Sequence, residues 1–275
     1  MSATGVSAQY VIELLALLAG AGLLAGFLSG LLGIGGGGIL VPVLYEAFGA
    51  ANVSEDVRMH LTLGTTLGVI APTVFRSFSA FRARGTVDID VVKRMAPWIV
   101  FGVIAGIIVA YFATSEVLRW IWVFFGTALA LKMFLGRDDW KISDTLPQPP
   151  WLEIAAALIG LIATLMGIGG ATFTVPLLTL NGMPLLRAVG TATGVGAVIA
   201  VSSIPGYVIS GWGEQGLPPL SLGYVNLGAL LIAPLAVVAA PYGVKLAHGV
   251  SKRALELAFA IFLTTVVARF LATLL

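Results

Sequence analysis

The sequence has no cysteine, only two histidines, and charged side chains at only 10% of its 275 positions. Without cysteine the chain has no disulfide bond, no thiolate metal site and no cysteine nucleophile. Two isolated histidines leave little for acid–base catalysis or metal binding, so we expect no enzyme, no metal site and no cofactor. Nothing fits the phosphate-binding loop G-x-x-x-x-G-K-[ST], which argues against an ATP-driven pump.

Hydrophobic residues, in contrast, make up 59% of the chain, and the mean hydropathy is +1.03. Apolar stretches long enough to cross a bilayer recur along its whole length, which predicts an all-α polytopic membrane protein. The net charge of +2 comes from basic residues in loops between these stretches. Membrane topology explains such loops, so we expect the lipid bilayer and no nucleic acid as a partner.

One glycine-rich phrase occurs twice, as Gly33–Pro42 and Gly167–Pro176. At a constant shift of 134 residues, Gly26–Leu44 and Gly160–Leu178 are identical at 9 of 19 positions. A second echo follows each copy, in Gly64–Gly68 and Gly190–Gly194. The chain is therefore a duplicated unit: residues 1–135 form the first transmembrane repeat, 136–150 a cytoplasmic linker and 151–275 the second repeat.

The glycine run divides the first apolar stretch of each repeat. Trp151–Leu180 would be ~45 Å long as one helix, whereas the hydrocarbon core is ~30 Å thick. Each repeat is thus predicted to hold a glycine-broken hairpin or double crossing, which stay open as alternatives, plus three transmembrane helices. Residues 1–9 carry no positive charge, so we expect the first stretch to belong to the repeat and not to a signal peptide. The apolar stretches are Tyr10–Phe48, His60–Ala80, Ala96–Ala113, Val117–Leu135, Trp151–Leu180, Ala188–Ile209, Leu222–Ala247 and Arg253–Leu275.

The distribution of lysine and arginine bears on how the two repeats are oriented. If every stretch crosses once, the repeats are parallel, with four helices each, and the basic residues divide almost evenly between the two sides. If the broken stretch re-enters or crosses twice, the second repeat is inverted and the N-terminus lies outside. Only Arg58, Arg119 and Arg269 of the 15 basic residues then lie outside. Cytoplasmic loops are rich in Lys and Arg, so the pattern favours inverted repeats. The cytoplasmic residues would be Arg76, Arg82, Arg84, Lys93, Arg94, Lys132, Arg137, Lys141, Arg187, Lys245, Lys252 and Arg253.

Each glycine break is expected to start a new helix near the bilayer midplane, from about Ile39 and about Phe173. The first amides of a helix have no internal partner and carry partial positive charge, and glycine lets a ligand approach them. Two facing breaks would hold a small anion without a formal positive charge. The predicted substrate-binding residues are Gly35, Gly36, Gly37, Thr65, Thr66, Arg76, Gly169, Gly170, Ala171, Thr172, Thr191 and Thr193.

Simpler interpretations stand beside this one. Glycines in membrane helices commonly serve close helix packing, and intramembrane threonines commonly bond to their own preceding turn. Arg76 either attracts anions or extends its side chain to the membrane surface. Glu13 and Glu153 occupy similar places early in the two repeats, where either could carry a coupling proton. The six tryptophans lie near segment ends, as expected for residues at the headgroup level.

With these residues in view, the chain resembles the sulfite exporter TauE/SafE family, also called the toluene sulfonate uptake permease family. The resemblance covers nearly the whole length and rests on Gly33–Pro42, Gly167–Pro176, Gly64–Thr66 and the basic turn Arg82–Asp88. It implies a bacterial inner-membrane carrier for sulfite, sulfonates or similar small anions. One difference is that Ala171–Thr172 stands where the first copy has Gly37–Gly38.

We therefore expect a secondary transporter that moves a small sulfur-containing anion by alternating access. An anion channel, or a carrier for another organic anion such as a carboxylate, is the alternative. Energy would come from a substrate gradient or from a coupling proton or cation. The identity of the anion, the direction of transport and the formation of a homo-oligomer stay open at this point.

The absence of cysteine allows a direct test of topology by thiol labelling of single cysteines at Gly5 and Gly213. Inverted repeats predict that an impermeant reagent applied to intact cells labels both positions. Parallel repeats with the N-terminus inside predict that both are labelled only after permeabilisation. The unmodified chain, which has no thiol, is the control.

Overall fold

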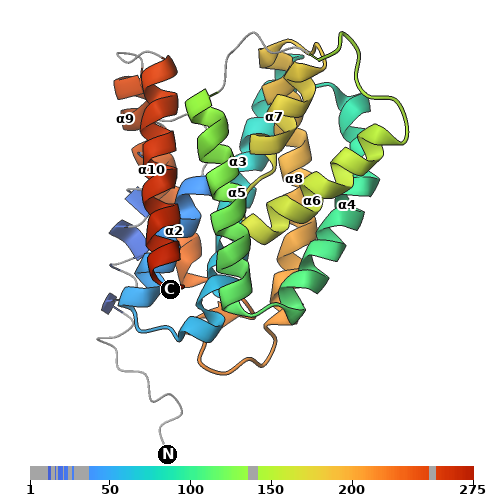
Figure 1. Cartoon of the computed structure of the whole chain (residues 1–275). Helices are drawn as coiled ribbons and strands as arrows, with labels where there is room; N and C mark the ends of the chain where they lie inside the picture. The colour runs from blue at the N-terminus through green and yellow to red at the C-terminus, as the bar shows by residue number, and fades with distance from the viewer. Residues whose placement is uncertain are drawn as a thin grey trace, which may run out of the picture.

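The computed structural model describes residues 37–135, 142–247 and 252–275, with scattered positions between 12 and 27. The described chain is a bundle of helices that run roughly along one axis (Figure 1). The first repeat contributes α2 (Gly37–Ala50), α3 (Glu55–Ala83), α4 (Ile89–Phe112) and α5 (Ser115–Leu135). The second contributes α6 (Trp151–Met166), α7 (Ala171–Leu180), α8 (Leu185–Ser210), β1 (Ser221–Leu222), β2 (Val225–Asn226), η1 (Gly228–Leu231), α9 (Ile232–Ala247) and α10 (Lys252–Ala272).

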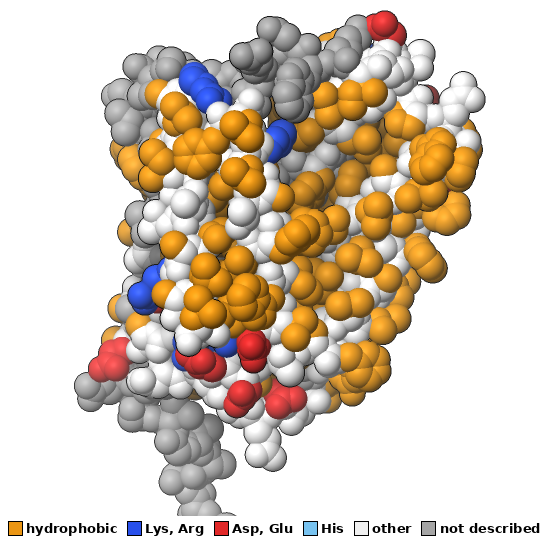
Figure 2. Space-filling model, in the orientation of Figure 1, with side chains coloured by type: hydrophobic (Ala, Val, Ile, Leu, Met, Phe, Trp, Pro, Cys, Tyr) orange, Lys and Arg blue, Asp and Glu red, His pale blue; other side chains and the backbone are white. Residues whose placement is uncertain are grey.

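Among the described residues, α4, α5 and α8 are each long and apolar enough to cross a membrane. The face seen in Figure 2 is largely hydrophobic over the length of the helices, and acidic side chains gather at its lower end. These observations agree with the prediction of an all-α membrane protein. The lower end carries the antiparallel pair β1–β2, and we call it the hairpin end. The opposite end carries residues 142–150, and we call it the linker end.

A short side chain binds a backbone amide at the start of α4 and at the start of η1. Asp88 Oδ1 accepts the amide of Val91 at 3.2 Å at the start of α4. Asn226 Oδ1 accepts the amide of Ala229 at 2.9 Å, ahead of η1 and α9. Each side chain satisfies an amide that the first helical turn leaves free, as Asp and Asn do at helix N-termini. Asp88 and Asn226 thus occupy matching places in the two repeats, before α4 and before η1 and α9.

Two pairs of helices with matching places in the repeats, α3 with α8 and α5 with α10, pack together and run antiparallel (Figure 1). In α3 and α8, a Cβ added at Gly64 would lie 2.9 Å from Tyr207 Cβ, and one added at Gly196 would lie 3.2 Å from Val74 Cγ1. Because the residue number rises along α3 as it falls along α8, the two helices point in opposite directions. Glycines at the crossing allow the backbones to approach closely.

A Gly-Thr pair on α3 receives the hairpin loop of the second repeat. A Cβ at Gly64 would overlap the carbonyl oxygen of Tyr224. The neighbouring Thr65 Oγ1 accepts a hydrogen bond from the backbone amide of Asn226 at 3.0 Å. Thr65 and Asn226 are both fully buried. Thr65 therefore satisfies a backbone donor that has no access to water, which would otherwise cost about 1–3 kcal/mol.

The matching Gly-Thr pair on α8 receives the loop before α4. A Cβ at Gly190 would lie 2.7 Å from the carbonyl oxygen of Thr86. Thr191 Oγ1 accepts the backbone amide of Asp88 at 2.9 Å. The repeated Gly-Thr pair of the sequence thus forms two reciprocal contacts. The pair in the second repeat holds the loop before α4, and the pair in the first repeat holds the loop before η1 and α9.

A second reciprocal contact joins α5 and α10, and its two arginines are 134 residues apart. Arg119, near the start of α5, donates to the carbonyl and hydroxyl oxygens of Thr273 at 3.4 and 3.3 Å, at the end of α10. Arg253, near the start of α10, donates to the carbonyls of Met133 and Phe134 at 2.8 and 2.6 Å, at the end of α5. Each guanidinium binds free carbonyls at the partially negative end of a helix.

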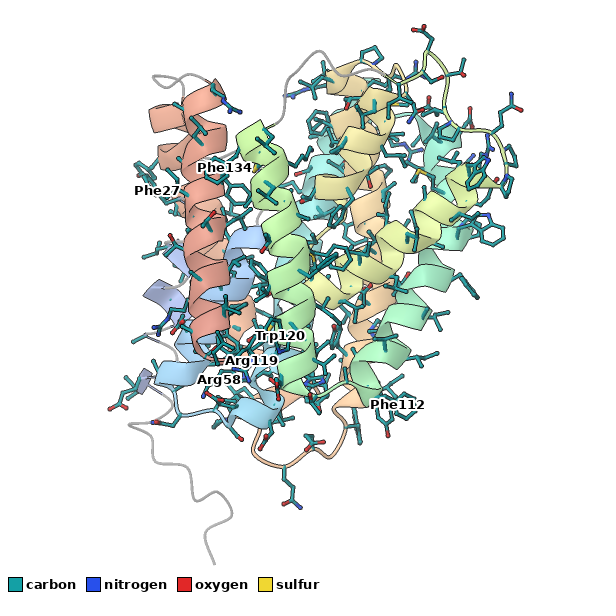
Figure 3. The ribbon with its side chains drawn as sticks, in the orientation of Figure 1. Phe27, Arg58, Phe112, Arg119, Trp120 and Phe134 are labelled. Atoms are coloured by element: carbon teal, nitrogen blue, oxygen red, sulfur yellow. The ribbon has the colours of Figure 1, made fainter. Side chains whose placement is uncertain are left out.

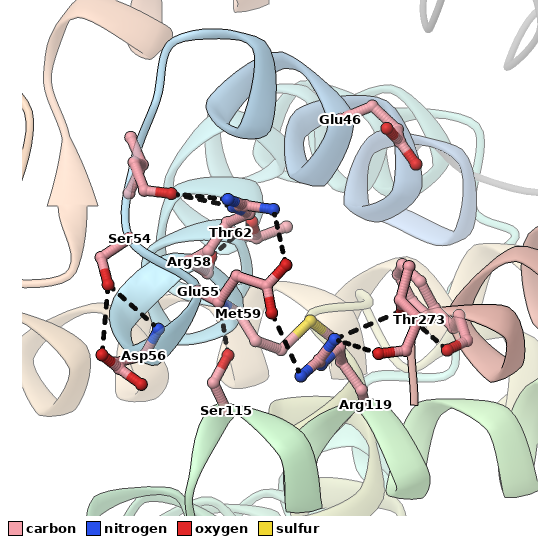
Figure 4. A network of polar contacts seen from close by, with 12 residues as sticks. Glu46, Ser54, Glu55, Asp56, Arg58, Met59, Thr62, Ser115, Arg119 and Thr273 are labelled. Atoms are coloured by element: carbon pink, nitrogen blue, oxygen red, sulfur yellow. Dashed lines mark hydrogen bonds and ion pairs between the residues drawn. The ribbon is translucent and has the colours of Figure 1, made fainter. Parts of the chain in front are cut away.

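The hairpin end holds a polar network in which α3, α5 and the end of α10 meet (Figure 4). Glu55 forms ion pairs with Arg58 at 3.6 Å and with Arg119 at 3.9 Å. Arg58 and Arg119 lie close together at this end of the bundle (Figure 3). Because the Arg119 side chain is only 7% exposed, its contacts with Glu55 and Thr273 keep a buried charge paired.

The two Gly-Thr contacts differ in burial, which gives a stability prediction. Thr65→Val keeps the shape but leaves the buried amide of Asn226 without a partner, so we expect a loss of about 1–3 kcal/mol. Thr191→Val affects the amide of Asp88, which is only half-buried and can be hydrated, so the loss should be smaller. Thermal unfolding midpoints of the purified variants measure the difference. Equal midpoints for both variants and the unmodified protein would contradict this assignment.

Candidate functional site

The second glycine phrase forms a sharp break between α6 and α7. Gly167 has φ 66° and ψ 31°, and Gly170 has φ 72° and ψ −17°. Both are left-handed conformations that cost about 1–2 kcal/mol for residues with a Cβ, and glycine adopts them freely. Helix α7 begins at Ala171, two residues before the start predicted from the sequence at Phe173. The difference arises because Gly170 serves as the N-cap, with its carbonyl accepting the amides of Phe173 and Thr174.

The carbonyl oxygens at the end of α6 are satisfied by the protein. The amides of Gly167 and Ile168 turn back to Thr164 and Ala163 at 3.3 and 3.0 Å, the pattern that commonly closes a helix at a left-handed glycine. Side chains from α8 and α5 also donate to carbonyls at the end of α6. Tyr207 Oη donates to the carbonyl of Thr164 at 3.0 Å, and Trp122 Nε1 donates to the carbonyl of Met166 at 3.3 Å.

The amides at the start of α7, unlike the carbonyls at the end of α6, have no described hydrogen-bond partner. The backbone N–H groups of Gly169, Gly170, Ala171 and Thr172 form no hydrogen bond with any residue that the structure describes. At most helix N-termini a Ser, Thr, Asp or Asn side chain accepts one of these amides, but Gly170 has no side chain to do so. Gly169, Ala171 and Thr172 are half-buried. The break thus offers consecutive donors next to the positive end of a helix dipole, an arrangement that suits an anion.

The start of α2 meets the break between α6 and α7. A Cβ on Gly37, the first residue of α2, would lie 2.8 Å from Ile168 Cα and 3.1 Å from the carbonyl oxygen of Gly167. Only glycine permits this approach of one backbone to the other. Gly35 and Gly36, predicted to share the site, lie outside the described residues. The contact at Gly37 nevertheless brings the start of α2 against the break that precedes α7.

Helices α3 and α8 enclose the break on two further sides. A Cβ on Gly169 would lie 3.6 Å from Ile70 Cδ1 and 3.7 Å from Val74 Cγ2, both on α3. On α8, Gly196 approaches the carbonyl of Gly169, and Ile199 fills the space where a Gly170 side chain would lie. The described side chains that approach Gly169 and Gly170 are therefore apolar, and apolar surroundings strengthen electrostatic interactions with a bound ion.

The predicted threonines are bound to protein groups. Thr65 and Thr191 accept the loop amides described above. Thr66 donates to the carbonyl of Thr62 at 2.7 Å, and Thr193 donates to the carbonyl of Gly190, both on the preceding turn of their own helix. The structure therefore gives these four residues packing roles, and it brings Gly37, Gly169, Gly170, Ala171 and Thr172 together at the break.

Arg76 lies on α3, two residues beyond Val74. Its side chain is exposed and forms no hydrogen bond or ion pair with a described residue. The position fits a charge at the mouth of a pathway and equally a side chain extended to the membrane surface. Within the described residues no group of three or more His, Asp or Glu side chains is placed to hold a metal ion.

Trp122 departs from the expectation that the tryptophans lie at the headgroup level. It is fully buried, and its ring packs edge-to-face on Phe270 at 5.4 Å. Trp98, Trp151 and Trp212 are exposed as expected. The sequence offered one signal, since Trp122 lies several residues inside an apolar segment, but its role at the carbonyl of Met166 could not be predicted.

Comparison with known proteins identifies the family. The model described as sulfite exporter TauE/SafE matches residues 18–270. The chain belongs to the TauE/SafE family. The resemblance inferred from the glycine phrases is thereby confirmed.

Curated relatives of this TauE/SafE protein are named as transporters. A probable membrane transporter protein of Haemophilus influenzae is 33% identical over 260 residues, which cover 94% of this chain and 97% of the relative. A probable membrane transporter protein of Methanocaldococcus jannaschii is 26% identical over 251 residues, which cover 89% and 90%. No solved structure matches the chain. Together with its apolar helices, these relatives identify the chain as a membrane transporter.

Gly170 gives a test of the break with a matched control. Gly170→Ala places a Cβ in a left-handed conformation and against Ile199, so we expect backbone strain of about 1–2 kcal/mol plus overpacking of about 1–3 kcal/mol. Gly213→Ala has the strain alone, because Gly213 has φ +79° with nothing within 4 Å. We expect the Gly170 variant to have a lower unfolding midpoint than the Gly213 variant and to lose transport in proteoliposomes. Equal stability and transport in both variants would show that the break tolerates a side chain.

Proposed function

We propose that this TauE/SafE protein is a secondary transporter that moves a small sulfur-containing anion, such as sulfite or a sulfonate, by alternating access. The observation that carries the proposal is the unequal hydrogen bonding at the break. Its carbonyls are bound by protein donors, whereas the amides from Gly169 to Thr172 have no partner among the described residues. These half-buried amides at the start of a helix are accessible to a ligand, and an anion is the natural acceptor for several adjacent donors.

The chemistry of the site suits a transported substrate. A sulfite or sulfonate group presents three oxygens around one sulfur, and these can accept several amides from one helix turn. Binding by neutral amides avoids a salt bridge with a formal charge, so the ion can be released again. The sulfur-containing class rests on the family description; a carboxylate, with two acceptor oxygens, is the alternative that the same site would accept.

Several contacts support two inverted repeats over two parallel ones. Matching helices α3 and α8 run antiparallel, as do α5 and α10. The contacts of Thr65 and Arg119 recur at Thr191 and Arg253 with the roles of the repeats exchanged. Such exchange is the pattern expected from a two-fold axis in the membrane plane.

The charged residues support a cytoplasmic linker end and an N-terminus outside. At the hairpin end, Arg58 and Arg119 contact Glu55, and Arg269 binds Glu46 at 2.6 Å. The other described arginines lie toward the linker end. Cytoplasmic loops are enriched in Lys and Arg, and for this reason we propose that the linker end faces the cytoplasm. It would orient the transporter in the bacterial inner membrane as the sequence predicts.

The hairpin end is closed in this conformation. All residues of Gly223–Asn226 are buried, and Tyr224 stacks on His60 with ring centroids 5.0 Å apart. His60 Nε2 in turn donates to the carbonyl of Ala110 at 3.0 Å, at the end of α4. Burial, together with the neighbouring Glu214, raises the pKa of Tyr224 to about 12, so the hydroxyl stays neutral at physiological pH. The hairpin is thus buried at this end of the bundle and is held there by Thr65 and His60.

Among the residues that the structure describes, the matching contacts at the linker end are less buried. Thr86–Asp88, which match the buried hairpin residues, are only half-buried, and Arg253 is exposed whereas its counterpart Arg119 is buried. This inequality supports a conformation that opens toward the linker end. In the opposite conformation the two repeats would exchange roles, so that the loop before α4 becomes buried and the hairpin is released.

A substitution at Gly169 tests the transport site. The backbone of Gly169 is compatible with a side chain, and a Cβ there meets only ordinary contacts at 3.6 and 3.7 Å. Gly169→Ala is therefore the matched control, which we expect to fold and transport. Gly169→Leu would extend over the free amides of α7, so we expect transport of sulfite or a sulfonate into proteoliposomes to fall at least tenfold at a similar amount of folded protein.

Gly35→Leu is expected to have the same effect in the first copy. Saturation and counterflow of labelled substrate distinguish a carrier from a channel, which would conduct steadily without counterflow. If Gly169→Leu and Gly35→Leu both transport at a rate near that of the unmodified protein, the breaks serve packing and not substrate binding.

A further inference from the structure

A groove lies between α4 and α6, away from the break. The two helices touch where Gly102 meets the carbonyl of Ala157 and Gly160 meets the carbonyl of Ile99. Toward the linker end they enclose a groove of about 470 Å³. Its apolar walls are Trp98 and Phe101 on α4 and Ile154 and Leu158 on α6, all of them exposed, and Pro149–Pro150 lie at its upper end.

The position of the groove places its mouth at the headgroup level of the bilayer. Lys93 and Arg94, both exposed, lie about one turn before Trp98 on α4. Basic residues followed by an exposed indole are typical of the membrane–water boundary. Phe101 and Leu158 lie deeper along the helices, where acyl chains run. A ligand in this groove therefore has its polar part beside Arg94 and its apolar part below.

Glu153 is the polar group at the mouth. Its side chain is 15% exposed, and Oε1 accepts Arg94 Nη2 at 3.4 Å. The other oxygen, Oε2, is buried and has no hydrogen-bond partner among the described residues. A carboxylate oxygen without a donor is expensive at the edge of an apolar region. The site therefore lacks a donor that reaches Oε2 from the groove. Lys93 adds a positive charge that forms no ion pair with a described residue.

We propose that this groove binds a phospholipid with a primary ammonium headgroup, of the phosphatidylethanolamine class. The three parts of such a lipid match the three parts of the site. Its ammonium donates to Glu153 Oε2, its phosphate lies beside Arg94 and Lys93, and an acyl chain follows Phe101 and Leu158. Charge-assisted hydrogen bonds of this kind are the strong ones, and basic residues beside transmembrane helices commonly bind lipid headgroups.

The experiment uses headgroup methylation on the unmodified protein. The purified chain is placed in nanodiscs of equal parts phosphatidylethanolamine, its dimethyl derivative and phosphatidylcholine, then released for native mass spectrometry. Each methyl group removes an N–H donor, so retention should fall along the series. We expect phosphatidylethanolamine to be retained about tenfold over phosphatidylcholine, the factor that a charge-assisted hydrogen bond supplies.

Two variants locate the effect. Glu153→Gln keeps the size of the side chain but loses its charge, and it should reduce the preference for phosphatidylethanolamine to about twofold or less. Glu116→Gln, an exposed carboxylate at the hairpin end, is the control and should leave the preference unchanged. Equal retention of the three lipids by the unmodified protein overturns the proposal. So does a dimer, observed in the same spectra, whose cross-links cover the groove without bound lipid.

Discussion

The structure depends on how backbone polar groups are satisfied where a helix is broken inside an apolar bundle. At the break between α6 and α7 the carbonyls are bound by returning amides and by Tyr207 and Trp122. The amides of α7 have no such partners among the described residues. We propose that these amides bind a ligand that accepts hydrogen bonds. The close contact at Gly37 and the left-handed conformations of Gly167 and Gly170 explain why glycine is needed here.

Duplication supplies the rest of the arrangement. Thr65 of the first repeat binds the loop before η1 and α9, and Thr191 of the second repeat binds the loop before α4. Each repeat also contributes an arginine, Arg119 or Arg253, that binds the end of the other's last helix. The contacts occupy matching positions in the two repeats, but their residues differ in burial: Asn226 and Arg119 are buried, whereas Asp88 is half-buried and Arg253 is exposed. In our proposal the protein has a second conformation, in which the more buried contact of each pair becomes the less buried one. The proposed alternating access would then need only the exchange of these contacts between the two repeats.

The sequence predicted the helical segments, the break between α6 and α7 and the family, because hydropathy and glycine runs are local signals. It placed the start of α7 at Phe173 and not Ala171, since only the structure shows that Gly170 adopts the conformation of an N-cap. The roles of Thr65 and Trp122 could not be predicted, because their partners lie 161 and 44 residues away. The first glycine run remains a prediction at Gly35 and Gly36, which lie outside the described residues.

The most direct measurement is the position of a transported anion in the protein. Selenite is a close analogue of sulfite with a strong anomalous signal, and its uptake by the purified protein in liposomes can be confirmed first. In crystals soaked with transported selenite, the account predicts an anomalous peak within hydrogen-bonding distance of the amides from Gly169 to Thr172. A peak elsewhere in the bundle, with those amides packed against protein atoms, would contradict it.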